Sequence, residues 1–71
     1  MDVVKIADGV PALIGMTIYV LDGIRIVERE IIAIEGNMLM YKDPSYSGCR
    51  AEYVYSTKLA AELGYRKDGL L

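Results

Sequence analysis

Residues 16–23 of this 71-residue chain have the sequence MTIYVLDG, and this stretch decides the fold. The run Met16–Leu21 is rich in β-branched and aromatic side chains, which pack well on the pleated surface of a strand. It ends at Asp22-Gly23, and both residue types accept the backbone angles of a tight turn. We therefore expect strands over 16–21 and 24–35 that pair antiparallel as a hairpin.

The apolar pattern of the second strand changes phase halfway along. Ile24 and Ile26 occupy even positions, whereas Val27 and Ile31 continue the apolar set on odd positions. Side chains alternate between the two faces of a strand, so a flat strand does not produce this shift, but a bend or β-bulge does. The pattern predicts a bent strand that contributes to both sheets of a small barrel.

A second hairpin is expected at Gly36-Asn37, another pair that suits a tight turn. In the following strand, Met38–Lys42, the two methionines point to one face, and the leucine and tyrosine point to the other. Residues 43–48 (DPSYSG) predict an exposed loop, because each residue type there favours a bend. Alternation resumes over Cys49–Tyr55, which we predict as the next strand.

The two ends of the chain carry weaker signals. The sequence DGVP at residues 8–11 predicts a turn that follows a short strand at 3–6. Ser56 or Thr57 can cap a helix that continues through Leu63 and stops at Gly64. So short a helix is stable only when docked, and the leucines at 59 and 63, four positions apart, are expected to dock it. We expect the tail, 65–71, to fray or to join an interface.

These elements together predict an all-β fold. Short strands joined by hairpins, one bent strand and a terminal helix describe a small SH3-like barrel of about five antiparallel strands with a short C-terminal helix. We expect a single domain over residues 1–71, with the barrel core over about 15–55 and the helix over about 57–63.

Turn and core residues along the chain also support a resemblance to a known group of proteins. The residues are Gly15, Ile18-Tyr19-Val20, Asp22-Gly23, Glu28, Glu30-Ile31, Ile34, Tyr41, Val54, Thr57-Lys58 and Ala61-Glu62. Over about residues 15–63 the chain resembles small SH3-like barrel proteins of unknown function found in gut bacteria and in their phages and mobile elements. The resemblance implies the same barrel fold but carries over no catalytic residue, and residues 1–14 lie outside it.

The composition argues against catalysis. The chain has no His and a single cysteine, Cys49, so a thiol nucleophile has no imidazole to activate it. Glu28 and Glu30 share a strand face and could form an acid–base pair if buried, but a charged edge that resists aggregation is the stronger interpretation. No glycine-rich phosphate loop is present. We expect no enzyme activity, no cofactor and no metal site.

Size and apolar content indicate a partner. For a chain of this length, apolar burial and the entropy of ordering nearly cancel, so binding or oligomerisation would stabilise it. A hydrophobic content of 54% exceeds what a small core can hide. A lone cysteine, no evident signal peptide and no apolar run of about 20 residues predict a cytoplasmic protein with no membrane span.

The expected function is therefore a non-enzymatic protein-interaction module that self-associates. Tyrosine and methionine side chains form adaptable contact surfaces, although they also fill core gaps. The candidate interface residues are Tyr19, Met38, Met40, Tyr41, Tyr46, Tyr53 and Tyr55. A module that binds a larger phage or host protein is equally compatible with these residues.

The alternative function is nucleic-acid binding by the barrel. Basic side chains beside tyrosines could contact phosphates and bases; they are Arg25, Arg29, Lys42, Arg50 and Lys58. A formal net charge of −2 and a pI of about 4.9 weigh against this alternative.

Overall fold

A computed structural model describes residues 3–42 and 46–71 of the chain. It is mostly β, with two small antiparallel sheets and one C-terminal helix. The elements in chain order are β1 (Thr17–Asp22), β2 (Arg25–Glu30), β3 (Ala33–Glu35), β4 (Met38–Lys42), β5 (Tyr46–Arg50), the 3₁₀ helix η1 (Ala51–Tyr53) and α1 (Lys58–Lys67).

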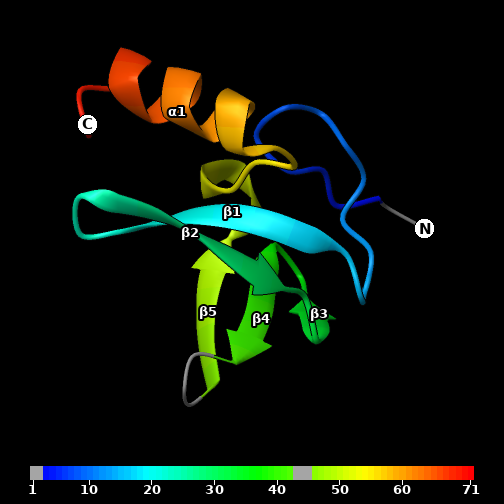
Figure 1. The fold of residues 1–71 in the computed structure, drawn as a ribbon. Helices are drawn as coiled ribbons and strands as arrows, with labels where there is room; N and C mark the ends of the chain where they lie inside the picture. Colours follow the sequence, from blue (N-terminus) through cyan, green and yellow to red (C-terminus); the bar gives the residue numbers. More distant parts are fainter. Residues whose placement is uncertain (1–2, 43–45) are drawn as a thin grey trace.

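The described elements stack in three levels, with the β1–β2 hairpin in the middle (Figure 1). The sheet β3-β4-β5 lies against one face of this hairpin, and its strands run across those of β1 and β2. Helix α1 lies lengthwise along the opposite face. The main core between the sheets is built from fully buried side chains that include Ile18, Leu39 and Val54.

The first hairpin forms as the sequence predicts, but its turn lies one residue later than the expected pair Asp22-Gly23. Asp22 pairs with Arg25, so Gly23 and Ile24 are the two turn residues. Gly23 has a φ of +66°, whereas no residue other than glycine has a positive φ in the described part of the chain. A positive φ at the first turn position alone is the pattern of a type II′ turn, whose twist matches that of the flanking strands.

The predicted bend in the second strand is confirmed. Ile31 donates its N–H to the carbonyl of Met16, and Ile32 donates to the carbonyl of Met40. Successive residues thus bond to opposite sheets, so the predicted single strand 24–35 becomes β2 in one sheet and β3 in the other. Ile31 lies at the bend and is fully buried, which explains why the apolar pattern changes phase there.

The predicted faces of β4 are also confirmed. Leu39 is fully buried and Tyr41 packs against the core from the same side. Met38 is 39% exposed on the opposite face, opposite Glu35 and Arg50 on the neighbouring strands. The outer surface of the β3-β4-β5 sheet therefore carries the methionines.

The strand predicted at 49–55 is wrong in its position. β5 spans Tyr46–Arg50, so residues 46–48, expected in a loop, belong to the strand, while residues 43–45 lie outside the described part of the chain. Residues 51–53 form η1 instead of continuing the strand. The reason is that Ala51 and Val54 are both buried, and their spacing of three fits a 3₁₀ turn and not the alternation of a strand.

The predicted stop of the helix at Gly64 is wrong, because α1 continues to Lys67. A Cβ atom on Gly64 would overlap the hydroxyl and ring atoms of Tyr55, so the glycine provides room for that side chain. Gly69 follows the C-cap residue Asp68 and has a φ of +77°. Gly69 donates its N–H to the carbonyl of Arg66, and Leu70 donates its N–H to the carbonyl of Tyr65. These two hydrogen bonds form a Schellman motif.

The predicted docking residues of the helix are wrong as well. Leu59 and Leu63 are 66% and 58% exposed, whereas Ala61 and Tyr65 are buried. Both pairs have the spacing of one helix face, so spacing alone does not distinguish them. The Tyr65 ring buries more surface than a leucine and also carries a hydroxyl that finds a backbone acceptor, which favours its side of the helix.

Residues 3–16 pack against the core as an irregular loop. A single bridge between Lys5 and Pro11 replaces the strand expected at 3–6. Ile6 and Ala12 are buried, and the N–H of Ala7 donates to the carbonyl of Val54. The turn at residues 8–11 lies within this loop, as the sequence predicts, and this segment forms part of the single core.

Candidate interaction surface

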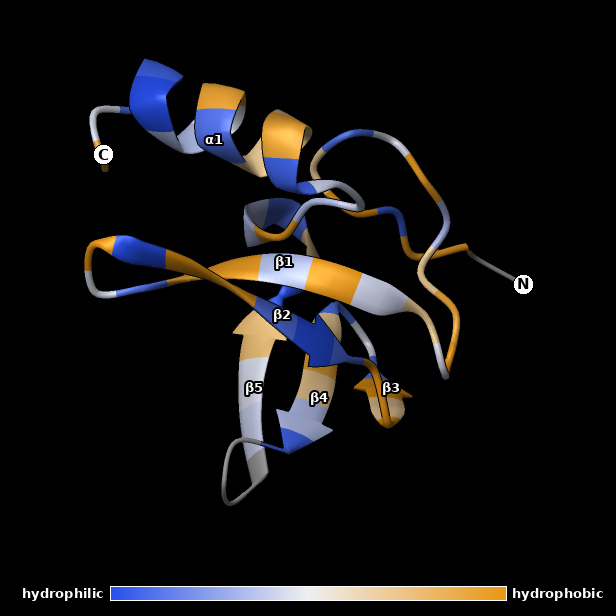
Figure 2. Ribbon diagram, viewed as in Figure 1, coloured by the Kyte–Doolittle hydropathy of each residue, from blue (hydrophilic) through white to orange (hydrophobic). Residues whose placement is uncertain are grey.

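Exposed apolar side chains gather around α1 and the tip of the first hairpin. Ile24 is 86% exposed at the turn, and Leu70 and Leu71 are about half exposed after the helix. Leu59 and Leu63 lie one turn apart on the solvent side of α1; we name this pair the α1 face. Figure 2 shows apolar colour on the first two turns of α1 and polar colour on its last turn.

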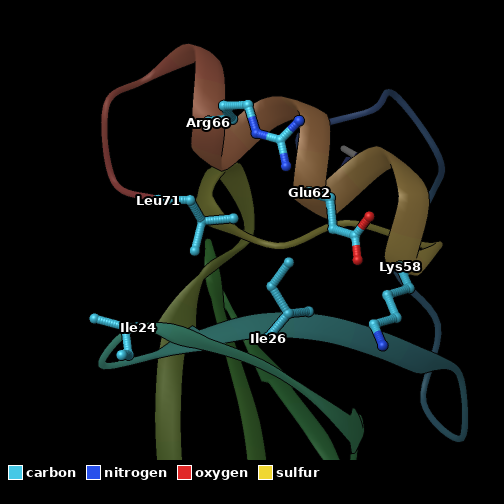
Figure 3. Close-up of a pocket in the computed structure, with 6 residues that line it drawn as sticks. All are labelled: Ile24, Ile26, Lys58, Glu62, Arg66 and Leu71. Atoms are coloured by element: carbon cyan, nitrogen blue, oxygen red, sulfur yellow. The ribbon is translucent and has the colours of Figure 1, made fainter.

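A groove lies between the first hairpin and the helix. It has a volume of about 400 Å³ and is lined by Ile24, Ile26, Lys58, Glu62, Arg66 and Leu71. We name it the β2–α1 groove. Figure 3 shows Lys58 and Glu62 reaching from α1 toward the hairpin and Arg66 lying along the helix farther from it, with Leu71 and Ile24 near one end. The groove thus has an apolar floor and a charged wall.

The charged wall follows one row of the helix. Lys58, Glu62 and Arg66 are spaced by four residues, so successive side chains lie about 6 Å apart along the axis. In the part of the chain that the structure describes, no ion pair joins any of the three to another side chain. The wall therefore presents a positive, negative and positive charge in sequence to whatever enters the groove.

The helix that carries both surfaces is firmly fixed at its ends. The Thr57 side chain accepts the N–H of Ala60 at 3.1 Å as the N-cap. Tyr65 packs edge-on against Tyr55, with ring centroids 5.1 Å apart, and donates its hydroxyl to the carbonyl of Tyr53. Burial raises the pKa of Tyr65 to about 12. Because its hydroxyl stays protonated, this anchor holds at neutral pH.

A second contact fixes the approach to the helix. The Asp8 carboxylate accepts the Ser56 N–H at 3.0 Å and the Ser56 hydroxyl at 2.6 Å. Partial burial alone would raise the pKa of Asp8, but these hydrogen bonds outweigh it and lower that pKa from its ordinary value. The N-terminal loop is thereby attached to the residue that precedes the N-cap.

The structure brings some of the predicted interface residues together. Tyr19 and Tyr55 exchange backbone hydrogen bonds, and the Tyr55 ring packs against the helix. The Tyr19 hydroxyl donates to the Glu28 carboxylate at 3.1 Å. These two tyrosines lie between the first hairpin and α1 and are half-buried, so much of their surface serves the fold.

The remaining predicted interface residues lie elsewhere. Met38 and Met40 are on the outer face of the β3-β4-β5 sheet, while Tyr41 is on its inner face. Tyr53 is 56% exposed in η1. Tyr46 begins β5, and its side chain lies outside the described part of the structure. The predicted residues thus do not form one continuous surface.

The basic residues of the nucleic-acid alternative are also dispersed. Lys58 lines the groove, and Arg25 lies beside the first turn. Arg50 forms an ion pair with Glu52 at 2.7 Å, and Lys42 ends β4 far from the helix (Figure 1). Arg29 donates to the carbonyl of Glu28 at 2.6 Å. Only Lys58 belongs to the groove.

The side chains considered above for catalysis, Cys49, Glu28 and Glu30, lie on strands of the two sheets. Burial raises the pKa of the Cys49 thiol, which keeps it protonated at neutral pH. Glu28 and Glu30 both lie on the helix side of β2, and Glu28 is the acceptor for Tyr19. Among residues 3–42 and 46–71, no three histidine, cysteine, aspartate or glutamate side chains lie close enough together to hold a metal ion.

Comparisons with known proteins return no counterpart. No protein-family model, no curated protein and no solved structure matches the chain. Within the described residues, no helix has the length and apolar content needed to cross a bilayer.

The sequence contains one signal for this surface that composition and alternation do not reveal. Ile24 occupies the second position of a tight turn, where polar residues and glycine are usual, and it is the most exposed of the large apolar residues described. An isoleucine at this position is an exposed apolar side chain that the turn itself does not require. The rest of the groove depends on where α1 lies over the hairpin.

Proposed function

We propose that this chain is a non-enzymatic protein-interaction module that self-associates through the α1 face. The observation that carries the proposal is the exposure of Leu59 and Leu63, which are 66% and 58% exposed on a helix whose other face is docked. Adjacent exposed leucines on one helix are typical of contact with a second helix.

The α1 face is complementary to itself. When two copies of α1 cross antiparallel at the level of Ala61 along the helix axis, Leu59 of each copy lies opposite Leu63 of the other. In that register Lys58 lies opposite glycine and Glu62 lies opposite alanine, so no like charges meet. A contact made by one ten-residue helix is small, which predicts a weak, reversible dimer.

Sedimentation velocity over a range of concentrations tests the proposal. The unaltered chain should form a dimer as concentration rises, and the double variant Leu59→Ser, Leu63→Ser should remain a monomer. Leu13→Ser is the matched control, because Leu13 is 64% exposed but lies in the N-terminal loop. A monomer at every concentration, or equal association of the double variant, would contradict the proposal.

We also propose that the two sheets are an open form of an SH3-like barrel. Two observations support this: the bent segment that passes from β2 to β3, and the bridge that pairs Tyr55 with Tyr19 on the far side of β1. An NMR structure should then show through-bond couplings across the hydrogen bonds between Tyr19 and Tyr55. Their absence would leave the sheets as a simple stacked pair.

A further inference from the structure

The α1 face continues into a basic residue near the C-terminal end of the helix. Leu59, Leu63 and Arg66 have the spacing i, i+4 and i+7, which places the three side chains in one stripe along an α-helix. Figure 3 agrees with this placement, because the Arg66 side chain lies along the helix and not toward the hairpin. Arg66 is exposed, and no ion pair joins it to another side chain within residues 3–42 and 46–71. A helix that covers the two leucines therefore also meets this guanidinium.

An acidic side chain lies just beyond the N-terminal end of the same helix. The Asp8 carboxylate accepts the N–H and the hydroxyl of Ser56, the residue before the N-cap, and Figure 1 shows the N-terminal loop beside this end of α1. Asp8 remains exposed while it makes these bonds, so a further donor can reach the carboxylate. No basic side chain in the described part of the same copy forms an ion pair with it. Ser56 thus holds a carboxylate in place that is open to a cation from another molecule.

The antiparallel register of the proposed dimer brings these two charges together. Leu63 of one copy lies opposite Leu59 of the other, and a step of three residues forward on one chain is a step of three backward on its partner. Arg66 of each copy therefore lies opposite Ser56 of the other, where the Asp8 carboxylate is bound. The axes of packed helices are about 8–10 Å apart, a separation that a long arginine side chain can bridge. The two-fold axis repeats the contact, so an opposite-charge pair forms at each end of the leucine contact.

The other charged side chains of α1 near this contact point away from it. Lys58 and Glu62 reach toward the hairpin, on the side of the helix away from the second copy (Figure 3). Asp68 follows the buried residues Ala61 and Tyr65 at the spacing i, i+4 and i+7, so it belongs to the docked side of the helix. The α1 face therefore presents a positive end to the negative end of its partner, with the leucines between them.

We infer that two reciprocal ion pairs set the antiparallel orientation of the dimer, in which the Arg66 guanidinium of each copy binds the Asp8 carboxylate of the other. The N-terminal loop is then part of the interface. A parallel arrangement would instead set Arg66 beside Arg66 and Asp8 beside Asp8, and like charges facing across an interface suppress it. This inference rests on the proposed self-association through the α1 face and adds the residues that select its orientation.

Charge reversal in two separate variants, followed by mixing, tests the inference by sedimentation velocity. Asp8→Lys sets two positive charges against each other at each end of its own dimer, and Arg66→Glu sets two negative charges against each other. Each variant alone should associate about tenfold more weakly than the unaltered chain, which corresponds to about 1.4 kcal/mol. An equimolar mixture restores an opposite-charge pair at both ends of the mixed dimer. The mixture should therefore associate about as tightly as the unaltered chain.

The controls separate this contact from net charge and from folding. Asp8→Lys reduces the net negative charge of the chain, so general charge repulsion alone would strengthen its association. Arg25→Glu makes the same charge change as Arg66→Glu on an exposed residue of the first hairpin and should leave association unchanged. If circular dichroism shows that Asp8→Lys does not fold, Asp8→Asn replaces it. That variant keeps an oxygen for Ser56, and its dimer should be about threefold weaker.

The outcomes distinguish this inference from the proposal on which it rests. If the unaltered chain forms a dimer that Leu59→Ser, Leu63→Ser abolishes, but the variants at Asp8 and Arg66 associate as tightly as the unaltered chain, the α1 face stands and the ion pairs are overturned. Charge-reversed variants that weaken association but do not recover it on mixing overturn the ion pairs as well. An unaltered chain that is a monomer at every concentration overturns both.

Discussion

The two hairpins share one turn geometry but differ in what surrounds it. Each turn begins with a glycine at positive φ, +66° at Gly23 and +59° at Gly36. In the second turn Asn37 accepts the N–H of Ala51 through its carbonyl, which joins the turn to the next segment of the chain. In the first turn Ile24 occupies the same position and is 86% exposed. The second turn supports the fold, whereas the first presents an apolar side chain that the fold does not need.

The largest contrast is expected two residues beyond each turn. Leu39 follows Asn37 by two positions and is fully buried, while Ile26 follows Ile24 by two positions and is half-buried. Leu39→Ala should lower the free energy of unfolding by about 3 kcal/mol, because it removes buried methyl groups and leaves a cavity. Ile26→Ala should cost about 1 kcal/mol or less, since its side chain is already partly in water. Urea denaturation of both variants measures the difference, and equal losses would remove the contrast between the hairpins.

The turn glycines should show what the hairpins share. A Cβ atom at Gly23 or Gly36 meets no atom within 4 Å, so any loss of stability on substitution by alanine comes from the backbone conformation alone. Each Gly→Ala change should lower the free energy of unfolding by about 1–2 kcal/mol. Thermal and urea unfolding will test this. Gly→Asn serves as the control at both positions, because asparagine accepts positive φ at turn positions more readily than alanine does and should lose less. A much larger loss at one turn would show that the two geometries differ.

A smaller effect is expected at the contact between Asp8 and Ser56, which fixes the N-terminal loop beside the helix. The folded pKa of Asp8 is lowered, so its carboxylate stabilises the fold above the unfolded pKa, and this contribution is lost as pH falls through the folded pKa. In Asp8→Asn, stability should therefore depend less on pH below about 4. Thermal unfolding from pH 2 to pH 7 measures this, with Asp22→Asn as a control that removes an exposed carboxylate. An identical pH dependence in Asp8→Asn and the unaltered chain would contradict it.

The smallest effect on stability is expected at the tip of the first hairpin. Ile24→Asn places the residue of the second turn into the first, and the free energy of unfolding should change by about 0.5 kcal/mol or less, because Ile24 buries almost no surface in the fold. A strong loss of stability in urea would show that Ile24 supports the fold and would remove the reason for assigning it to an interface.

The sequence predicts the strands best where local chemistry and burial agree. The hairpin beside Gly23 and the bend at Ile31 are visible from residue types and from the change of phase in the apolar pattern, although the turn lies one residue later than the predicted pair Asp22-Gly23. The position of β5 is not, because Cys49, Ala51, Tyr53 and Tyr55 continue an alternating pattern, whereas the fold buries Ala51 and Val54 through a 3₁₀ turn. Local sequence patterns do not distinguish a continued strand from a 3₁₀ turn here, and tertiary packing decides between them.

The candidate surface is less visible in the sequence than the fold. Leu59 with Leu63 and Ala61 with Tyr65 have the same spacing, so periodicity does not show which pair faces the core. The groove requires Lys58, Glu62 and Arg66 to lie over Ile26, a contact between segments more than 30 residues apart. Ile24 alone gives a local signal, as an apolar residue in a tight turn.

Gly64 links the helix to the rest of the molecule in a way that bears on dynamics. Glycine within a helix costs about 1 kcal/mol relative to alanine, so α1 has little stability of its own. The space that a side chain at position 64 would occupy is filled by Tyr55. The Tyr55 backbone is hydrogen-bonded to Tyr19 in β1. Opening α1 therefore exposes the ring and loosens the bridge to β1 at once. The amide hydrogens of α1 and of Tyr19 should accordingly exchange with solvent at matching rates, as one cooperative unit, more slowly than those of the β1–β2 turn.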